Sequence, residues 1–185
     1  GTFHFSTKVT DLHIEDGRIS KIELNHKEWK DVSGVILAIG HSARDTFEML
    51  YERKVPMMAK SFAVGMRVEH PQDMINESQY GRNADMTLLP TAAYKVTHQS
   101  SNGRGVYSFC MCPGGYVVNA SSEEGRLAVN GMSYRSRDSK NANSAIIISV
   151  TPEDFPKPDH PLSGVVFQRK LEEAAWKLAE GKVPQ

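Results

Sequence analysis

Residues 8–42, "KVTDLHIEDGRISKIELNHKEWKDVSGVILAIGHS", decide the fold class of this chain. Apolar and polar residues alternate over 9–15 and 18–24, and the intervening turn contains Gly17, which tolerates a positive φ. The segment 26–32 is short and polar, as in an edge strand. Residues 34–40, "GVILAIG", form a continuous apolar run that is typical of a strand buried on both faces of a sheet. The pattern predicts a three-stranded meander, then a buried strand, then a helix over 41–54.

The rest of the chain predicts a mostly antiparallel sheet with flanking helices. In the final helix we expect Val166, Leu171, Ala174, Ala175 and Leu178 to share a face that packs on the core. The fold class is therefore α+β, with residues 1–54 resembling part of an α/β sheet and 55–185 forming a second domain. The expected strands lie at 61–71, 92–99, 106–112, 116–120, 127–133 and 145–150, and the helices at 71–81 and 162–181.

Composition excludes several classes of function. Lys+Arg and Asp+Glu are equal at 22 each, so no net charge favours nucleic acid or an anionic membrane. No apolar run reaches the roughly 20 residues needed to span a bilayer. Two cysteines and no signal-peptide pattern favour a reducing, cytoplasmic location. The chain starts in strand-like alternation and ends soon after a helix, so we expect a piece of a longer protein.

The two cysteines lie in "YSFCMCPGGYVV", residues 107–118. On a straight strand Cys110 and Cys112 would project from one face with their Cα atoms about 6.6 Å apart. A mutual disulfide would then require a bend or a bulge. Structural packing, a thiol close to a substrate or cofactor, and a metal or strain role stay open. Of these alternatives, a metal site is not the one we expect, because His70 and His98 are the nearest further ligands and their spacing fits no metal motif.

The glycines after the cysteines are candidates for binding. Gly114 and Gly115 follow a buried strand and Pro113, where they could let backbone amides approach a planar or anionic ligand. The alternative is a plain tight turn.

Five further positions carry polar chemistry. His70 could act as a general base or cap the helix that follows Pro71, and we favour the cap. Arg135 and Arg137 could clamp a carboxylate or phosphate, or lie in a solvated loop. The asparagines of "NAN" (141–143) are expected to satisfy loop backbone groups.

Long stretches resemble a known family. "GVILAIGHSARDTFEML", "KSFAVGMRVEHPQDMIN", "GVYSFCMCPGGYVVNASSEEGRLAVNGMSYRSRD" and "NANSAIII" are similar to bacterial FAD-dependent dehydrogenases, described as NAD(FAD)-utilising and distantly like glutathione-reductase-type flavoproteins. The resemblance covers essentially the whole chain. Those proteins are longer, and their Gly-x-Gly-x-x-Gly unit and the Gly-rich segment that closes over the flavin have no counterpart here. The resemblance implies that residues 1–54 are the C-terminal portion of a split FAD-binding domain, with 55–185 inserted as a substrate or lid domain.

The resemblance also assigns cofactor contacts. Val9 matches the place where backbone groups read the adenine, and Ala38, Ile39 and Gly40 match an Ala-x-Gly turn at the pyrophosphate. We add His41, which follows that turn, and the two glycines 114 and 115. Catalytic candidates are the two cysteines and His70.

The implied function is hydride transfer between a nicotinamide, FAD and an unknown acceptor, with NAD(P)H as co-substrate and the isolated piece inactive. The expected partners are a small-molecule substrate or electron acceptor and the rest of the parent chain, without nucleic acid or membrane. The alternative is a non-enzymatic module that binds a ligand or a protein.

Overall fold

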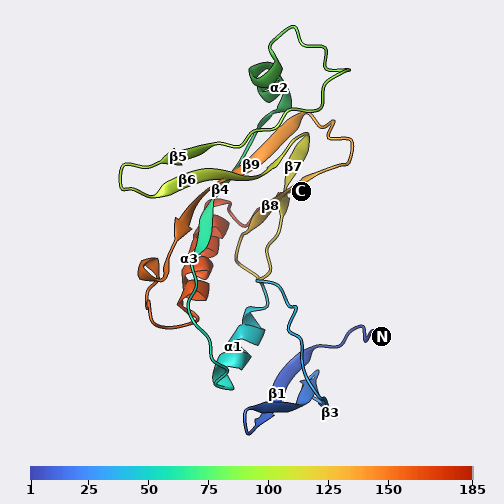
Figure 1. Ribbon diagram of the computed structural model, residues 1–185, viewed down its shortest axis with the longest axis vertical. Coiled ribbons are helices and arrows are strands. Elements are labelled where there is room, and N and C mark those ends of the chain that lie inside the picture. The colour runs from blue at the N-terminus through green and yellow to red at the C-terminus, as the bar shows by residue number, and fades with distance from the viewer. Residues whose placement is uncertain (185) are drawn as a thin grey trace.

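The computed structural model describes residues 1–184 and confirms the α+β class (Figure 1). The chain begins with the expected meander, an antiparallel sheet in the order β1-β2-β3. Its tight turn places Asp16 and Gly17 at positive φ, as a two-residue hairpin connection requires. The short helix α1 follows. The elements are β1 (Val9–Glu15), β2 (Arg18–Leu24), β3 (Glu28–Asp31) and α1 (Arg44–Glu52).

The buried strand predicted at 34–40 is not formed, and that prediction is wrong for the described chain. Residues 34–40 run without regular secondary structure between β3 and α1. Ile36 is 94% exposed, and Leu37 and Ile39 are also exposed. The physical reason is that a strand needs a neighbour for its backbone groups, and residues 1–184 place none beside this segment.

A four-stranded antiparallel sheet with the order β4-β9-β6-β5 organises the second part of the chain. The long strand β9 lies at its centre, as its apolar and β-branched run "AIIISV" predicts. Two further strands form a hairpin whose members contact the sheet, β7 against β9 and β8 against β6. The bounds are β4 (Phe62–Pro71), β5 (Thr97–Gln99), β6 (Gly105–Cys112), β7 (Gly115–Asn119), β8 (Val129–Ser133) and β9 (Asn141–Val150).

The helices of this part are α2 (Gln72–Tyr80), the 3-10 turn η1 (Pro152–Asp154) and α3 (Ser163–Leu178). Helix α2 ends at Gly81 with a φ of 87°, as expected for a glycine cap. An aromatic cluster joins α3 to the sheet: the ring of Phe62 lies 5.1 Å from that of Phe155 and 6.2 Å from that of Phe167.

The predicted core face of α3 is wrong. Val166, Leu171 and Leu178 are 54%, 43% and 88% exposed. Instead, α3 turns polar side chains toward the buried guanidinium of Arg44 on α1, where Glu172 contributes an ion pair of 2.7 Å and Gln168 a hydrogen bond of 3.1 Å. Helix α3 thus packs on the sheet through Phe167 and turns polar side chains toward α1. An apolar stripe is left exposed.

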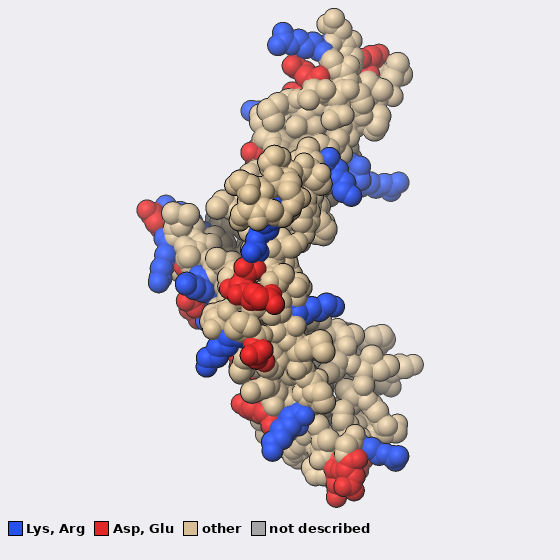
Figure 2. Space-filling view, turned by 60° about the vertical axis from the view of Figure 1, so that its left-hand side comes forward, with Lys and Arg blue, Asp and Glu red and all other residues tan. Residues whose placement is uncertain are grey.

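Charge is dispersed over the surface. On the face drawn in Figure 2, basic and acidic side chains are scattered and mixed in sign, in keeping with the balanced composition. Among residues 1–184, the helices are too short or too polar to cross a membrane.

Candidate functional site

The cysteine strand contains a β-bulge. Phe109 pairs with Ala145 of β9 and Cys112 with Asn143, so β6 carries one residue more than its partner over this interval. Cys110 adopts a φ of 46°, a left-handed conformation that is uncommon outside glycine. The straight-strand geometry predicted for the two cysteines is therefore wrong. Both thiols are free: Cys110 is exposed, and the half-buried Cys112 donates through Sγ to the carbonyl of Cys110 at 3.3 Å.

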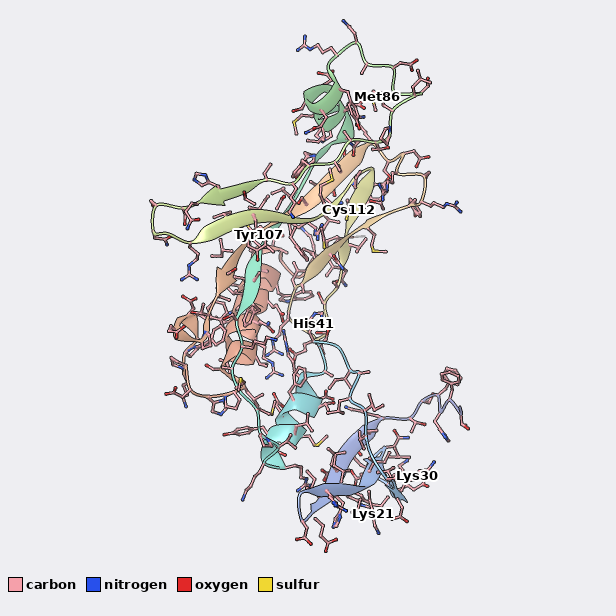
Figure 3. All side chains as sticks on the ribbon, viewed as in Figure 1. Lys21, Lys30, His41, Met86, Tyr107 and Cys112 are labelled. Atoms are coloured by element: carbon pink, nitrogen blue, oxygen red, sulfur yellow. The ribbon has the colours of Figure 1, made fainter. Side chains whose placement is uncertain are left out.

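The bulge lies beside a half-buried arginine on β4. Arg67 Nη1 donates to Asn143 Oδ1 at 2.7 Å and to the carbonyl oxygen of Cys110 at 3.2 Å, and lies 4.0 Å from Cys112 Sγ. Its Nη2 lies 3.4 Å from Asn130 Oδ1 on β8. We call these five residues the Arg67 cluster. The cluster lies between the sheet and the β7–β8 hairpin, and Figure 3 labels its member Cys112.

Asn143 is the best-buried member of the cluster. Its side chain is 0% exposed, and its Nδ2 has no hydrogen-bond partner within residues 1–184. The expectation that it serves a loop is wrong, because it lies in β9 and orients Arg67. A Cβ at Gly131 would lie 2.1 Å from Asn143 Oδ1, 2.3 Å from Arg67 Nη1 and 2.9 Å from Cys112 Sγ. With these three side chains in their observed places, there is no room for a Cβ at position 131.

Arg67 differs from the other half-buried arginines in the charge of its partners. Within the described residues its acceptors are all neutral, and no carboxylate lies within 4 Å of it. The nearest acid along the strand, Glu69, is used elsewhere: Oε1 accepts from Asn141 at 2.6 Å and Oε2 from the backbone of Val117 at 3.2 Å. Sequence reasoning missed Arg67, although one charge inside the apolar run "FAVGMRV" was the available signal.

The glycine turn is packed against the chain itself. Gly114 and Gly115 are buried, and the Gly114 N–H donates to Gln72 Oε1 at 2.8 Å. A Cβ would lie 2.0 Å from the Arg137 carbonyl oxygen at Gly114 and 2.4 Å from that of Met132 at Gly115. The observed close approach is thus to protein backbone. A contact of these glycines with a cofactor stays a prediction.

His70 does not cap α2, so that prediction is wrong. It lies in β4, and the N-cap of the helix is Pro71, with no side-chain cap among residues 1–184. Its Nε2 lies 2.9 Å from the hydroxyl of Tyr94, while Nδ1 is buried without a partner in the described chain. Arg135 and Arg137 are exposed, as the solvated-loop interpretation expects. Residues 1–184 hold no group of three or more acidic, His or Cys side chains placed to bind a metal.

The other residues predicted to contact FAD, Val9 and 38–41, lie in the first part of the chain. A groove of about 330 Å³ between the β1–β2 sheet and α1 is lined by Val9, Lys8 and Met49, among others. Asn25 donates to the Lys8 carbonyl at 2.9 Å, so alternation along the strand turns the backbone groups of Val9 away from β2. Gly40 has a φ of 69° and open space where a Cβ would lie.

The two groups of candidates are not brought together. Figure 3 places His41 in the connection that leads to α1, and Cys112 in the upper sheet, well apart from it. The residues 38–41 are exposed. A site that used both groups would therefore need material outside the described residues.

The geometry defines an α+β protein with a small meander, a four-stranded antiparallel sheet and an arginine–thiol cluster on that sheet. The chain belongs to the family described as FAD-dependent protein, C-terminal domain-like, which matches residues 61–185. A protein of Clostridium beijerinckii, described as uncharacterized, is 52% identical over 182 residues. That match covers 98% of this chain but 34% of the relative, so the chain spans about a third of that protein's length.

Proposed function

We propose that this chain is the internal part of a longer FAD-dependent dehydrogenase. Residues 1–54 would complete the FAD-binding domain, and 55–185 would form a second domain that faces the substrate. The proposed parent is cytoplasmic, takes electrons from NADH or NADPH, and is distantly like the glutathione-reductase-type flavoproteins. The isolated piece is expected to be catalytically silent, and the partners are the rest of the parent chain and a small-molecule acceptor.

Family membership supports the cofactor, and the segment 34–40 carries the proposal. An apolar run such as "GVILAIG" is costly to leave in water, yet Ile36 is 94% exposed and the segment has no strand neighbour in residues 1–184. A parent that covers both faces of this segment would remove that cost. The match to only 34% of the relative is in keeping with such a parent.

The residues present fit FAD. The groove beside α1 offers the free backbone groups of Val9, as adenine recognition through the main chain requires. Ala38, Ile39 and Gly40 would pass close to the pyrophosphate, and the open side of Gly40 leaves room for it. When bound, FAD would supply two-electron transfer between the nicotinamide and an acceptor. This chain would position the cofactor and exclude water.

The test is an absorbance spectrum of the intact protein, followed by titration with NADH and with NADPH. We expect flavin bands that bleach with one of the two nicotinamides. A Gly40→Val variant should lose most of the flavin, since valine is strained at a φ of 69°. Gly34→Val is the matched control, because Gly34 lacks a positive φ and no atom of residues 1–184 lies within 4 Å of its Cβ position. An intact, folded protein without flavin absorbance would refute the proposal.

A further inference from the structure

We propose that the Arg67 cluster is a binding site for an oxyanion, the carboxylate or phosphate of a small-molecule ligand. The binding does not depend on the cofactor. Only the further step, that this ligand is the electron acceptor, rests on the proposed function.

The first argument is the charge of Arg67. A guanidinium carries five N–H donors and a permanent positive charge, and half-buried charges in proteins are normally paired. Arg67 has three neutral oxygen acceptors, and within residues 1–184 its Nε donates to nothing. Arg44, a structural arginine of this chain, is by contrast neutralised by two carboxylates. The protein therefore fixes the orientation of the Arg67 guanidinium but does not neutralise its charge, so the group can bind an anion.

The second argument is Asn143. Fully buried amide groups nearly always find a partner, and each exception calls for an explanation. Its Oδ1 fixes Arg67, while its Nδ2 stays unpaired in the described chain. Asn143 thus fixes the direction of the guanidinium, and an oxyanion seated at the cluster would accept from Arg67.

The third argument is access. Cys110 and Asn130 are exposed, and Phe109, in register with Arg67 across Ala145, is 55% exposed. The small side chain of Ala145 thus lies between a cation on β4 and an aromatic ring on β6. A ligand with an acidic group and an apolar body fits this arrangement of charge and surface.

The cysteine next to Arg67 makes the site measurable in the intact protein. In a Cys110→Ser background, iodoacetate and the neutral iodoacetamide are used to alkylate Cys112, and the modified peptide is quantified by mass spectrometry. Both reagents form the same C–S bond and release iodide, so they differ in the carboxylate. We expect saturable kinetics for iodoacetate. Arg67→Gln should lower the ratio of the iodoacetate rate to the iodoacetamide rate about tenfold or more, as for loss of a charge-assisted hydrogen bond.

Three further variants complete the design. Arg67→Lys should keep part of the ratio, and Asn143→Asp should abolish it by pairing Arg67 internally, even if Arg67→Gln fails to fold. Arg137→Gln is the matched control, since that exposed arginine lies outside the cluster. Its ratio should not change.

Protection separates the two kinds of oxyanion. Acetate and inorganic phosphate are added at an ionic strength held constant with sodium chloride. The anion that protects Cys112 from alkylation at the lower concentration shows whether the site prefers a carboxylate or a phosphate. An unchanged ratio in both Arg67→Gln and Asn143→Asp, or protection by neither anion, would overturn the proposal. Flavin is not involved in the readout, so this failure is distinct from failure of the dehydrogenase assignment.

Discussion

Gly131 is the residue on which the Arg67 cluster depends most directly. It lies on β8 opposite Val117, where a side chain would enter the space of Arg67, Cys112 and Asn143. Its φ is not in the left-handed region, so the requirement for glycine is one of space and not of backbone conformation. Close packing of this kind makes even one added methyl group costly.

Gly131→Ala should therefore destabilise the chain by about 1–3 kcal/mol, the usual cost of overpacking. Urea unfolding followed by circular dichroism measures the change. Gly105→Ala on β6 is the control, because no atom in the described part of the chain lies within 4 Å of a Cβ there, and we expect a change within about 0.5 kcal/mol. Equal effects of the two substitutions would contradict the packing argument.

The sequence predicted the strand of the cysteines but not their geometry. Alternation identifies a strand, whereas a bulge depends on where β9 can pair, and that is a tertiary property. The same limit explains Asn143, since "NAN" reads as loop by composition but pairs with β4 and β6 in the structure. The neutral surroundings of Arg67 could not be predicted, because they are formed by residues of three other strands, β6, β8 and β9.

At the scale of elements, α1 is held to both parts of the chain by charged side chains. Toward the meander, Lys8 pairs with Asp45 and Arg53 with Asp11. Toward α3, Arg44 meets Glu172, and Arg169 reaches Glu48 at 2.8 Å. Glu123, in the loop after β7, lies at the centre of the second group. This network explains why α3 turns its polar side toward α1, which helical periodicity alone did not predict.

The network predicts acid sensitivity. Hydrogen bonds from Arg169 and then Arg44 lower the pKa of Glu123 to about 2, from an ordinary value of 4.5. Between these two values the unfolded chain binds a proton at Glu123 that the folded chain does not. The contribution of Glu123 to the free energy of unfolding is therefore fully present above pH 4.5 and is lost as the pH falls toward 2. We expect a slope approaching about 1.4 kcal/mol per pH unit from this group at most, reduced by solvent screening.

Urea unfolding at a series of pH values from 6 to about 3 measures this slope. Glu123→Gln should be less stable at pH 6 and should show a shallower loss on acidification than the parent sequence. Parallel pH curves for the two proteins would show that Glu123 does not contribute in this window.

At the scale of the whole molecule, the sequence predicted most elements of both parts because their partners lie within the chain. The meander and the β4-β9-β6 core follow from alternation and from β-branched runs. The exception is 34–40, where the pattern indicates a doubly buried strand and the described residues offer nothing to bury it. In natural proteins the local sequence pattern generally agrees with the folded environment, so this mismatch supports the proposed longer parent protein.

Backbone amide exchange tests that interpretation directly. In a solution of chain 1–185, the amides of 35–39 should exchange at nearly the rate of an unstructured peptide, because no strand protects them. In the intact protein the same amides should be slowed by about a hundredfold or more, as expected for ladder hydrogen bonds whose opening costs a few kcal/mol. The amides of 145–148 in β9, central in its own sheet, are the control and should be slow in both samples. Rapid exchange of 35–39 in the intact protein would mean that the apolar run has no strand partner there either, and the placement of residues 1–54 in an FAD-binding domain would fail.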